Sequence, residues 1–592
     1  MDDKILDWVL PAEKFSQDGD PLSMQTVARE ILELDKNSAE GLAIMAEAAF
    51  YLGNVQEAQS VAQYALAVES QHLRGRLVMG GVAIKNFELK AQLQTLADVI
   101  ADAHKELKSL GEKLQAHKRK FAFNLRQRTP ADSDFEKRID KEIFITRSLL
   151  FKALCWSSNG LYLTGDPARA AQNLFEASSL TDNNALAAEL YSKHLFLRNY
   201  RDASQSQTKE LAQKYNSFFA HVKTFPHDKK SRDPDKKTHV GYISPDFREH
   251  AVANFISPLL ENFDADNFSV TCYSTGKSDF VTDKLKKFNV TWRDLQGEET
   301  LAAAEIIYED GVDILVDLSG HSQDSCLPIL AHKPAPVQMC GIGYTATTGL
   351  EAVDYFLSDK ICSPENLPTN FTEKILRVEP CSLCYSPSLI HEMPPPQLQA
   401  PAQKNNFMTY GCFNNFAKIT DELLYLWRAI LERVPNSRLI LKNKLCSLDE
   451  GRELIHKRFS KMSFPLERVE LRPYSPDYLE QYREIDVALD TSPYTGGTTT
   501  CEALYMGVPV VTLRGKTHGA RLGASILNAA DLSELVAQSP MDYINKAVQL
   551  ARRRELLIAY HVGLREHLQN SALMNSANYI RELEKIYLGT SC

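Results

Sequence analysis

The chain has 592 residues, of which 44% are hydrophobic and 24% are charged, and its formal net charge is -9 at pH 7. A chain of this length is too long for a single hydrophobic core, so we expect three or four domains. The net negative charge argues against a general nucleic-acid-binding protein, which normally presents a basic face.

The N-terminal residues, MDDKILDWVLPAEKF, lack the basic segment and long apolar core of a secretory signal. No run of 18 apolar residues predicts a membrane span. The eleven cysteines are scattered, and the pair Cys381 and Cys384 has no second pair at zinc-binding spacing. We therefore expect reduced thiols, no bound metal and a cytosolic location.

Residues 1–225 are rich in Ala, Leu, Gln and Glu and predict a wholly helical domain. Within it, residues 38–70 have small alanines on two helical stretches, and Gly53 and Asn54 break the chain between them, with Asn54 as a helix cap. This pattern is typical of a tetratricopeptide unit, and residues 165–203 form a fainter copy. Residues 85–150 predict long charged helices. The alternative for this region is a plain helical bundle.

The polar segment 222–237 predicts a linker, and the composition changes after it. Short β-rich runs then alternate with helical stretches, which predicts parallel sheets. The proline-rich segment 391–404 is a second linker. It separates two doubly wound halves, 238–400 and 405–570, and a final helix lies within 571–592. The expected strands are 239–244, 268–275, 312–319 and 336–344 in the first half, and 408–414, 437–443, 468–474, 486–491 and 508–515 in the second.

Two such halves imply a cleft, with ligands at the carboxyl ends of the strands. The segment 490–513, DTSPYTGGTTTCEALYMGVPVVTL, predicts a strand end, a turn, a helix and a second strand. Backbone N–H groups, threonine hydroxyls and a helix N-terminus would meet there, which suits a phosphate group. The segment has neither the lysine of a P-loop nor a GxGxxG motif. It therefore indicates a nucleotide-sugar site and a glycosyltransferase. The turn consists of Gly496, Gly497, Thr498, Thr499 and Thr500.

Three other groups would face this cleft. His250 follows the first strand and is a candidate general base or orienting group, the alternative being a surface histidine. Lys418 follows Asn414 and Asn415 just before a helix. There it could neutralise a leaving diphosphate, unless it is simply a solvated lysine. Glu502, inside the helix, could favour the helix dipole or accept from ribose hydroxyls.

Basic residues near a phosphate site are expected, and Lys516, His518 and Arg521 follow the last strand of the segment. Metal-using glycosyltransferases often carry Asp-x-Asp after a strand. The chain has this pattern at 132–134, 233–235 and 264–266, none of which follows an expected cleft strand. We therefore expect metal-independent chemistry without a cofactor.

Several motifs, taken in order, resemble the O-linked N-acetylglucosamine transferase family, including its bacterial members and the Spindly-type protein O-fucosyltransferases. They are HVGYISPDFREH, VDILVDLSGHS, HKPAPVQMCGIGYTATTG with VDYFLSD, CFNNFAKIT, and the 490–513 segment with HGARLGAS. The resemblance covers about 238–590 and extends more loosely over the helical half. It implies a GT-B type fold, with two Rossmann-like halves, and an inverting, metal-independent transfer.

The resemblance also implies residue roles. His250 matches the active-site histidine, and Lys418 matches the lysine that binds the diphosphate. Thr498 and Thr499 match the threonines at the donor phosphates, and Glu502 matches an acidic residue near the ribose. The residues expected to border the acceptor and sugar are His321, Gly343 and Tyr344.

The base-binding region departs from the animal enzyme. The loop RPYSPDYLEQY, whose Tyr474 is also expected to bind the donor, places Ser475 and Tyr478 near the positions of a lysine and a histidine. Gly497 replaces a histidine before the threonine pair. A uridine nucleotide is expected, and guanosine with fucose remains an alternative. A related group, the adhesin N-glucosyltransferases, uses asparagine as acceptor, whereas the threonine-rich loop here is closer to the O-linked group.

The sequence thus predicts a protein O-glycosyltransferase that moves N-acetylglucosamine from UDP-GlcNAc to Ser or Thr of a polypeptide bound by the helical domain. A flagellin or another surface protein would be a suitable acceptor in a bacterium. Two alternatives are a non-enzymatic scaffold that senses nucleotide-sugars and an enzyme with a small or lipid acceptor. The intact His250 and Lys418 argue against the former. The absence of an obvious membrane-binding helix argues against a lipid acceptor.

Overall fold

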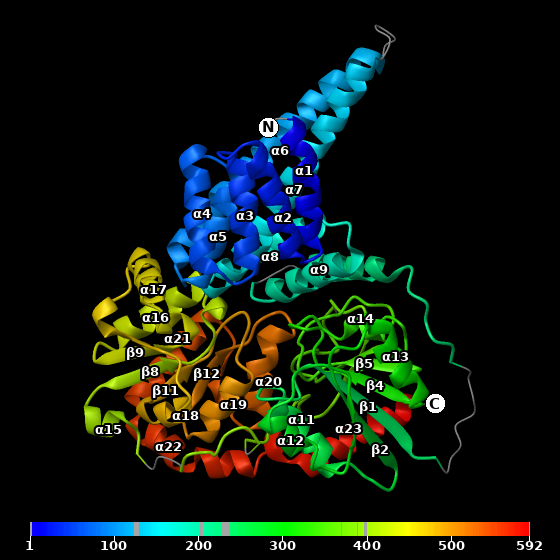
Figure 1. Ribbon diagram of the computed structural model, residues 1–592. Helices are drawn as coiled ribbons and strands as arrows, with labels where there is room; N and C mark the ends of the chain where they lie inside the picture. The colour runs from blue at the N-terminus through cyan, green and yellow to red at the C-terminus, as the bar shows by residue number, and fades with distance from the viewer. Residues whose placement is uncertain are drawn as a thin grey trace. The chain divides into compact units, whose positions relative to one another are not determined.

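The computed structural model describes residues 3–122, 129–201, 205–227, 236–368, 370–387, 389–395 and 399–590. The chain forms two compact units, Met1–Leu190 and Tyr191–Cys592 (Figure 1). The first unit is helical, and the second contains two parallel β-sheets. This confirms the predicted fold class. The Asp-x-Asp pattern at 233–235, and the parts of the predicted linkers at 228–235 and 396–398, lie outside the described residues.

The first unit consists of helices joined mostly by short turns. They are α1 (Asp3–Gln17), α2 (Pro21–Leu34), α3 (Ala39–Tyr51), α4 (Val55–Val68), α5 (Leu73–Lys85), α6 (Leu89–Ala122), α7 (Pro130–Leu163), α8 (Pro167–Ser178) and the start of α9 (Asn184–Arg198). Ser38 and Thr129 accept hydrogen bonds from first-turn N–H groups, as N-caps do. Asn54 occupies the N-cap position of α4, as predicted, but its side chain makes no capping hydrogen bond. It accepts no backbone hydrogen bond, and its amide donates to Glu57 Oε2 at 3.4 Å.

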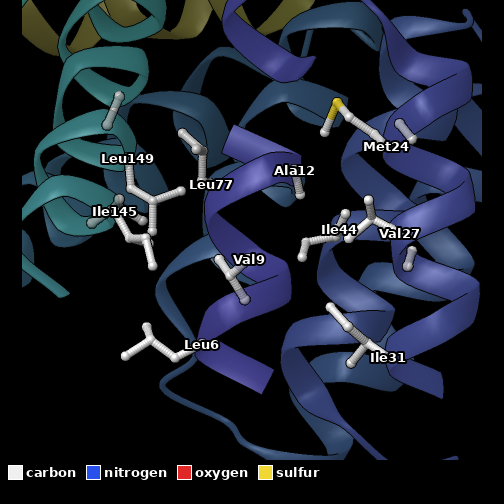
Figure 2. Packing of buried hydrophobic residues seen from close by; sticks show 14 of the residues in the cluster. Leu6, Val9, Ala12, Met24, Val27, Ile31, Ile44, Leu77, Ile145 and Leu149 are labelled. Carbon is white, nitrogen blue, oxygen red and sulfur yellow. The ribbon is translucent and has the colours of Figure 1, made fainter. Parts of the chain in front are cut away.

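The core of the first unit is a cluster of aliphatic side chains from α1, α2, α3, α5, α6 and α7 (Figure 2). Leu6, Val9 and Ala12 recur every three residues along α1 and therefore share one buried face. Figure 2 shows Ile44 of α3 between Val9 and Val27 of α2.

The predicted helix pair at 38–70 is present as α3 and α4. Ala46, Ala49, Ala58 and Ala62 are fully buried beside Phe50, so small side chains let the two helices approach closely. A second pair, α8 and α9, lies at the predicted fainter copy. The assignment of these pairs to the tetratricopeptide family stays a prediction.

A buried ionic cluster that the sequence does not predict lies beside this core. Arg74 Nε donates to Glu40 Oε1 at 2.7 Å, Nη1 donates to Glu47 Oε2 at 2.5 Å, and Nη2 donates to Glu13. Lys152 Nζ donates to Glu13 Oε2 at 3.1 Å and to Glu47 Oε1 at 2.5 Å. Burial by itself would raise the pKa of Glu47, but Lys152 and Arg74 outweigh burial and lower this pKa to about 2.

The first sheet of the second unit is parallel throughout, in the order β3-β2-β1-β4-β5-β6-β7. Its strands are β1 (Thr238–Ser244), β2 (Phe268–Ser274), β3 (Thr291–Asp294), β4 (Ile314–Asp317), β5 (Val337–Cys340), β6 (Tyr355–Ser358) and β7 (Lys374–Arg377).

The second sheet is also parallel, in the order β10-β9-β8-β11-β12-β13. Its strands are β8 (Met408–Cys412), β9 (Ser437–Lys442), β10 (Val469–Arg472), β11 (Val487–Leu489), β12 (Val510–Leu513) and β13 (Val536–Ala537). In both sheets the strand order reverses direction next to the first strand, which is where ligands of doubly wound folds bind.

Helices complete both halves. The first half has α10 (Gln205–Lys214), α11 (Ala253–Asn262), α12 (Phe280–Leu285), α13 (Thr300–Glu309) and α14 (Leu327–Leu330). The second has α15 (Ala402–Asn405), α16 (Asp421–Arg433), α17 (Asp449–Lys461), α18 (Tyr478–Gln481), α19 (Thr498–Tyr505), α20 (Leu522–Ala529), α21 (Pro540–Arg552) and α22 (Arg554–Gln569). The last helix, α23 (Ser576–Thr590), returns to pack on α11 of the first half, and the hydroxyls of Tyr587 and Tyr242 lie 3.1 Å apart.

Each of the nine expected strands overlaps an observed strand. The strands that were not expected include β3 and β7, which are edge strands with no fully buried residue and hence no apolar run in the sequence. The first unit ends at Leu190, earlier than the predicted boundary at 225. The reason is that later residues bond to the first sheet's loops: Ser192 pairs with His321 at 2.8 Å.

Within the described part of the chain, none of the helices combines the length and the apolar character needed to cross a lipid bilayer.

The ionic cluster predicts a large stability effect. Arg74→Met leaves Glu13, Glu40 and Glu47 without their shared cation, so we expect unfolding free energy to fall by about 3–5 kcal/mol. Chemical denaturation of the full chain measures this loss. Arg76→Ala is the matched control, because Arg76 pairs with the half-exposed Asp102 and should cost about 1 kcal/mol or less.

The same cluster makes the stability of the folded chain depend on pH. The folded-state pKa values of Glu40 and Glu47 lie below the ordinary 4.5. Their contribution to stability is therefore present above pH 4.5 and is lost as the pH falls below it. Equal acid sensitivity of wild type and Arg74→Met would contradict this account.

Candidate active site

The turn between β11 and α19 is held by one buried carboxylate, Asp490. Its Oδ1 accepts from the backbone N–H of Thr491 at 2.8 Å and of Gly496 at 2.7 Å. Its Oδ2 accepts from the Thr512 hydroxyl of β12 at 2.7 Å. The carboxylate thus fixes both ends of the turn against the neighbouring strand. Burial raises the pKa of Asp490 to about 6 despite these bonds.

Two glycines bring the turn to the start of α19. A Cβ on Gly496 would lie 2.5 Å from Thr500 Oγ1 and 2.7 Å from Thr499 Oγ1, so a larger residue would displace the threonines. Gly497 occupies the N-cap position of α19 and provides no side-chain cap. The helix therefore begins with uncapped N–H groups and the positive end of its dipole. Beside them, the buried Thr498 Oγ1 has no hydrogen-bond partner among the described residues.

Lys418 reaches this turn from a separate segment. It ends a 3₁₀ turn, η2 (Phe416–Lys418), just after β8. Its Nζ donates to Thr495 O at 3.1 Å and lies 3.5 Å from Asn414 Oδ1 and 4.6 Å from the centre of the Tyr494 ring. The Thr499 hydroxyl donates to the same Asn414 oxygen at 3.1 Å. The structure thus brings Lys418 and the threonine turn together.

The charge of Lys418 is poorly compensated. Burial lowers its pKa to about 8, and the Asp490 carboxylate only partly opposes this effect. A lysine with a depressed pKa at an uncapped helix N-terminus is a place where a bound anion would be strongly stabilising. The neighbouring Asn415 has a local role: its Oδ1 accepts from the Ala417 N–H at 3.0 Å and caps the 3₁₀ turn.

Glu502 lies one turn inside α19 and is buried. The Tyr478 hydroxyl donates to its Oε1 at 2.5 Å, and burial raises the pKa of Glu502 to about 7. In the same loop the Ser475 hydroxyl accepts from Lys442 Nζ at 2.8 Å, whereas the Tyr474 ring is exposed. The loop that the sequence assigns to the nucleoside is therefore linked to α19 through a tyrosine–carboxylate pair.

His250 belongs to the first half. It lies on the loop after β1, and its side chain is 42% exposed. Its Nδ1 lies 3.5 Å from Asp246 Oδ2 and 3.4 Å from the backbone N of Val252. Burial lowers the pKa of His250 below its ordinary 6.5, and Asp246 partly opposes this. The imidazole is therefore neutral at pH 7 and can accept a proton.

The residues expected on the acceptor and sugar side are buried. His321 Nδ1 pairs with the Ser192 hydroxyl and Nε2 with Thr348 O, both at 2.8 Å, and burial lowers its pKa to about 4. A Cβ on Gly343 would lie 2.0 Å from Leu318 O, so close packing requires glycine. The Tyr344 hydroxyl accepts from Asn199 Nδ2 at 3.3 Å. Because both nitrogens of His321 are engaged, its contact with a sugar stays a prediction.

The basic segment after β12 contacts the threonine turn through Gly519. Gly519 O accepts from the Thr495 hydroxyl at 2.9 Å, which joins this segment to the turn. Lys516, His518 and Arg521 line a separate cavity whose described lining includes neither Lys418 nor the threonines. The two halves are also tied together, since the Ser525 hydroxyl of α20 donates to Asp359 Oδ2 at 2.8 Å.

Two residues of the site were missed. They are Asp490, which the sequence shows only as the first residue of the 490–513 segment, and Tyr494, which lies in the turn. A buried aspartate directly after a strand, six residues before a glycine, is the signal that could have identified Asp490. The described residues contain no group of three or more His, Cys, Asp or Glu side chains placed to hold a metal. Metal independence stays a prediction.

Two parallel Rossmann-like sheets, with a lysine and an uncapped helix end at the carboxyl edge of the second, define a glycosyltransferase of the GT-B type. Comparison with known proteins specifies the family. The chain belongs to glycosyl transferase family 41, whose profile matches residues 198–381 and 398–583.

Named relatives agree with this family. The probable UDP-N-acetylglucosamine–peptide N-acetylglucosaminyltransferase SPINDLY of Solanum lycopersicum is 39% identical over 365 residues, which are 60% of this chain and 39% of that protein. The protein of the same name from Arabidopsis thaliana is 38% identical over 364 residues, 60% of this chain and 40% of its own length. The chain thus spans about two fifths of these curated relatives.

A solved structure matches the whole chain. A mutant O-GlcNAc transferase from Thermobaculum terrenum superposes with a TM-score of 0.68 at 26% sequence identity. The match covers 99% of this chain and 97% of the other. The family expected from the motifs is therefore confirmed.

The coupling between Asp490 and Lys418 gives a direct prediction. Asp490→Asn keeps an oxygen for the Gly496 N–H but removes the negative charge, so the pKa of Lys418 should fall below about 8. The measurement is an NMR titration of the ¹³C-dimethylated chain, with Lys418→Arg assigning the resonance. Asp486→Asn is the matched control, because Asp486 is also buried but bonds to the backbone of Ala402 and Thr409 instead. An unmoved Lys418 titration in Asp490→Asn would refute the coupling.

Proposed function

We propose that the chain is a protein O-glycosyltransferase that transfers N-acetylglucosamine from UDP-GlcNAc to Ser or Thr of a polypeptide, with inversion and without a metal. The observation that carries this proposal is the convergence of Lys418, Asn414 and Thr499 at the uncapped start of α19. The names of the relatives, which specify UDP-N-acetylglucosamine and a peptide, support the choice of donor and acceptor.

The donor diphosphate would lie against the threonine turn. Backbone N–H groups after Gly497, the hydroxyls of Thr498 and Thr499, and the Lys418 ammonium would stabilise the charge that develops as the glycosidic bond to the diphosphate breaks. These groups are preorganised, because Asp490 holds the turn before any ligand arrives. Glu502 and Tyr478 would contact the ribose or the base.

His250 would serve the acceptor. A neutral imidazole at pH 7 can accept a proton from a serine or threonine hydroxyl, or orient that hydroxyl by a hydrogen bond. Asp246, 3.5 Å from Nδ1, would stabilise the imidazolium if the proton is transferred. The attacking hydroxyl oxygen would then bond to the anomeric carbon while the nucleoside diphosphate leaves.

The helical first unit would bind the acceptor polypeptide, and an abundant surface protein such as a flagellin is a candidate acceptor. A GDP-fucose donor is the alternative that the altered base loop, Tyr474 to Tyr478, keeps open. Asparagine as acceptor and a non-enzymatic nucleotide-sugar sensor are further alternatives. The assay below distinguishes the GDP-fucose donor and the sensor from the proposed function.

The first test is nucleotide release from a panel of UDP- and GDP-sugars, with cell lysate as acceptor source. We expect release from UDP-GlcNAc that is insensitive to a chelator. Lys418→Ala should lower kcat about 100- to 1,000-fold, because it removes charge stabilisation of the leaving group. Lys457→Ala, an exposed lysine on α17, is the matched control and should leave turnover unchanged. Release from GDP-fucose alone would replace the proposed donor, and nucleotide binding without any release would favour the sensor.

The second test concerns His250. With His250 as base, activity falls on the acid side with a midpoint below pH 6.5, because the neutral imidazole is required and its pKa is lowered. Asp246→Asn should move that midpoint lower still, since the carboxylate raises the pKa. His250→Ala should reduce kcat about 100- to 10,000-fold and abolish the acid limb. A reduced kcat with an unchanged acid limb would assign His250 to orientation alone.

A further inference from the structure

A second cavity of about 470 Å³ lies where the two halves meet. Its walls come from β7 and the segment before it in the first half, from the segment after β12 in the second half, and from α10. The described lining contains none of Lys418, Thr498, Thr499 or Glu502.

The lining is rich in cations. Five basic side chains contribute to it, namely Lys209, Lys374, Arg377, Lys516 and Arg521. Among the described residues, no carboxylate lies within ion-pair distance of Lys374, Arg377 or Arg521. Both arginines are held in place through Nε: Arg377 donates to Ser363 O at 2.7 Å and Arg521 to Gly515 O at 3.0 Å. Their remaining guanidinium N–H groups are therefore positioned without a carboxylate partner.

The acidic residues of the cavity do not neutralise this excess. Glu373 Oε1 accepts from the Thr348 N–H at 2.7 Å and from the Thr348 hydroxyl at 2.5 Å. Its Oε2 accepts from the Thr347 hydroxyl at 2.7 Å and the Thr372 N–H at 3.1 Å. The other carboxylate, Glu365, belongs to an exposed residue. The cavity consequently carries a net positive charge.

Two of the lining groups are nearly inaccessible to solvent. Arg521 is 7% exposed, and burial together with the nearby Arg514 lowers its pKa. His518 is 5% exposed and packs edge-on against Phe356 and Phe371. Neither of its ring nitrogens has a hydrogen bond of ordinary geometry within the described residues.

His518 is also uncharged. Burial lowers its pKa to about 4; the Asp359 carboxylate opposes this effect, and Arg521 adds to it. A neutral imidazole carries one N–H donor, and within the described residues this donor has only a loose contact with the Thr345 backbone, beside an arginine without a carboxylate partner. Unpaired buried groups of this kind cost stability unless a ligand satisfies them.

We propose that this cavity is a second ligand site, which binds the phosphoryl group of a small metabolite through Arg521, Arg377 and Lys374, with His518 as a hydrogen-bond donor. A phosphoryl dianion or diphosphate suits several convergent cations better than a single carboxylate does. The volume exceeds that of a phosphate ion and leaves room for the rest of the molecule. Because both halves line the cavity, the ligand would contact both of them.

The test is calorimetric titration of the full chain with pyrophosphate. Lys418→Ala serves as the background, because it weakens binding at the threonine turn. We expect one equivalent of pyrophosphate to bind in this background. Adding Lys374→Glu should weaken that binding at least tenfold, whereas Lys287→Glu, an exposed lysine on the same half, should not. Arg521→Gln should act like Lys374→Glu, and thermal unfolding checks that each variant is folded.

No binding of pyrophosphate in the Lys418→Ala background would overturn the proposal. So would an affinity that stays within twofold in both Lys374→Glu and Arg521→Gln. Since Lys374 is exposed and lies on an edge strand, its substitution keeps the test valid if Arg521→Gln does not fold. The proposal does not depend on the transferase activity, because pyrophosphate binding is measured without any sugar donor.

Discussion

The structure of the candidate site depends on the buried carboxylate of Asp490. It joins two strands and a turn by accepting hydrogen bonds from Gly496, Thr491 and Thr512. Its negative charge also partly offsets the effect of burial on the pKa of Lys418. If the carboxylate were absent, the glycine turn could rotate away from α19, and the helix would no longer present its first N–H groups and the threonine hydroxyls together. The geometry that suits a diphosphate is thus a consequence of one side chain that would not itself touch the ligand.

The energetics of this pair explain why the site favours an anion. Burial raises the pKa of Asp490 to about 6 and lowers that of Lys418 to about 8, so neither charge is fully compensated by the other. A diphosphate at the start of α19 would place further negative charge near Lys418 and restore its preference for the protonated form. In the free protein the positive charge of Lys418 is therefore incompletely compensated, and a bound diphosphate would compensate it. The helix dipole would stabilise the same anion.

Much of the fold could be predicted from the sequence, because buried parallel strands are apolar runs and nine of them were recognised. The threonine turn and Lys418 were recognised for a similar reason: each lies directly after such a run. Asp490 and the Arg74 cluster could not be predicted in the same way. Their partners are distant in sequence, as Thr512 is from Asp490 and Glu13 is from Lys152, and no local pattern records such pairing. Edge strands such as β3 were missed because their residues are exposed on both faces.

The segment after β12 contributes residues both to the support of the threonine turn and to the wall of the second cavity. Gly519 bonds back to Thr495 and thereby supports the threonine turn, whereas the adjacent His518 and Arg521 face the other cavity. Asp359 of the first half accepts from the Ser525 hydroxyl of α20, and its carboxylate partly opposes the lowering of the His518 pKa by burial. The Asp359 carboxylate therefore acts on His518, the residue directly before Gly519, whose carbonyl oxygen supports the threonine turn. The segment after β12 therefore contacts both the threonine turn and the second cavity.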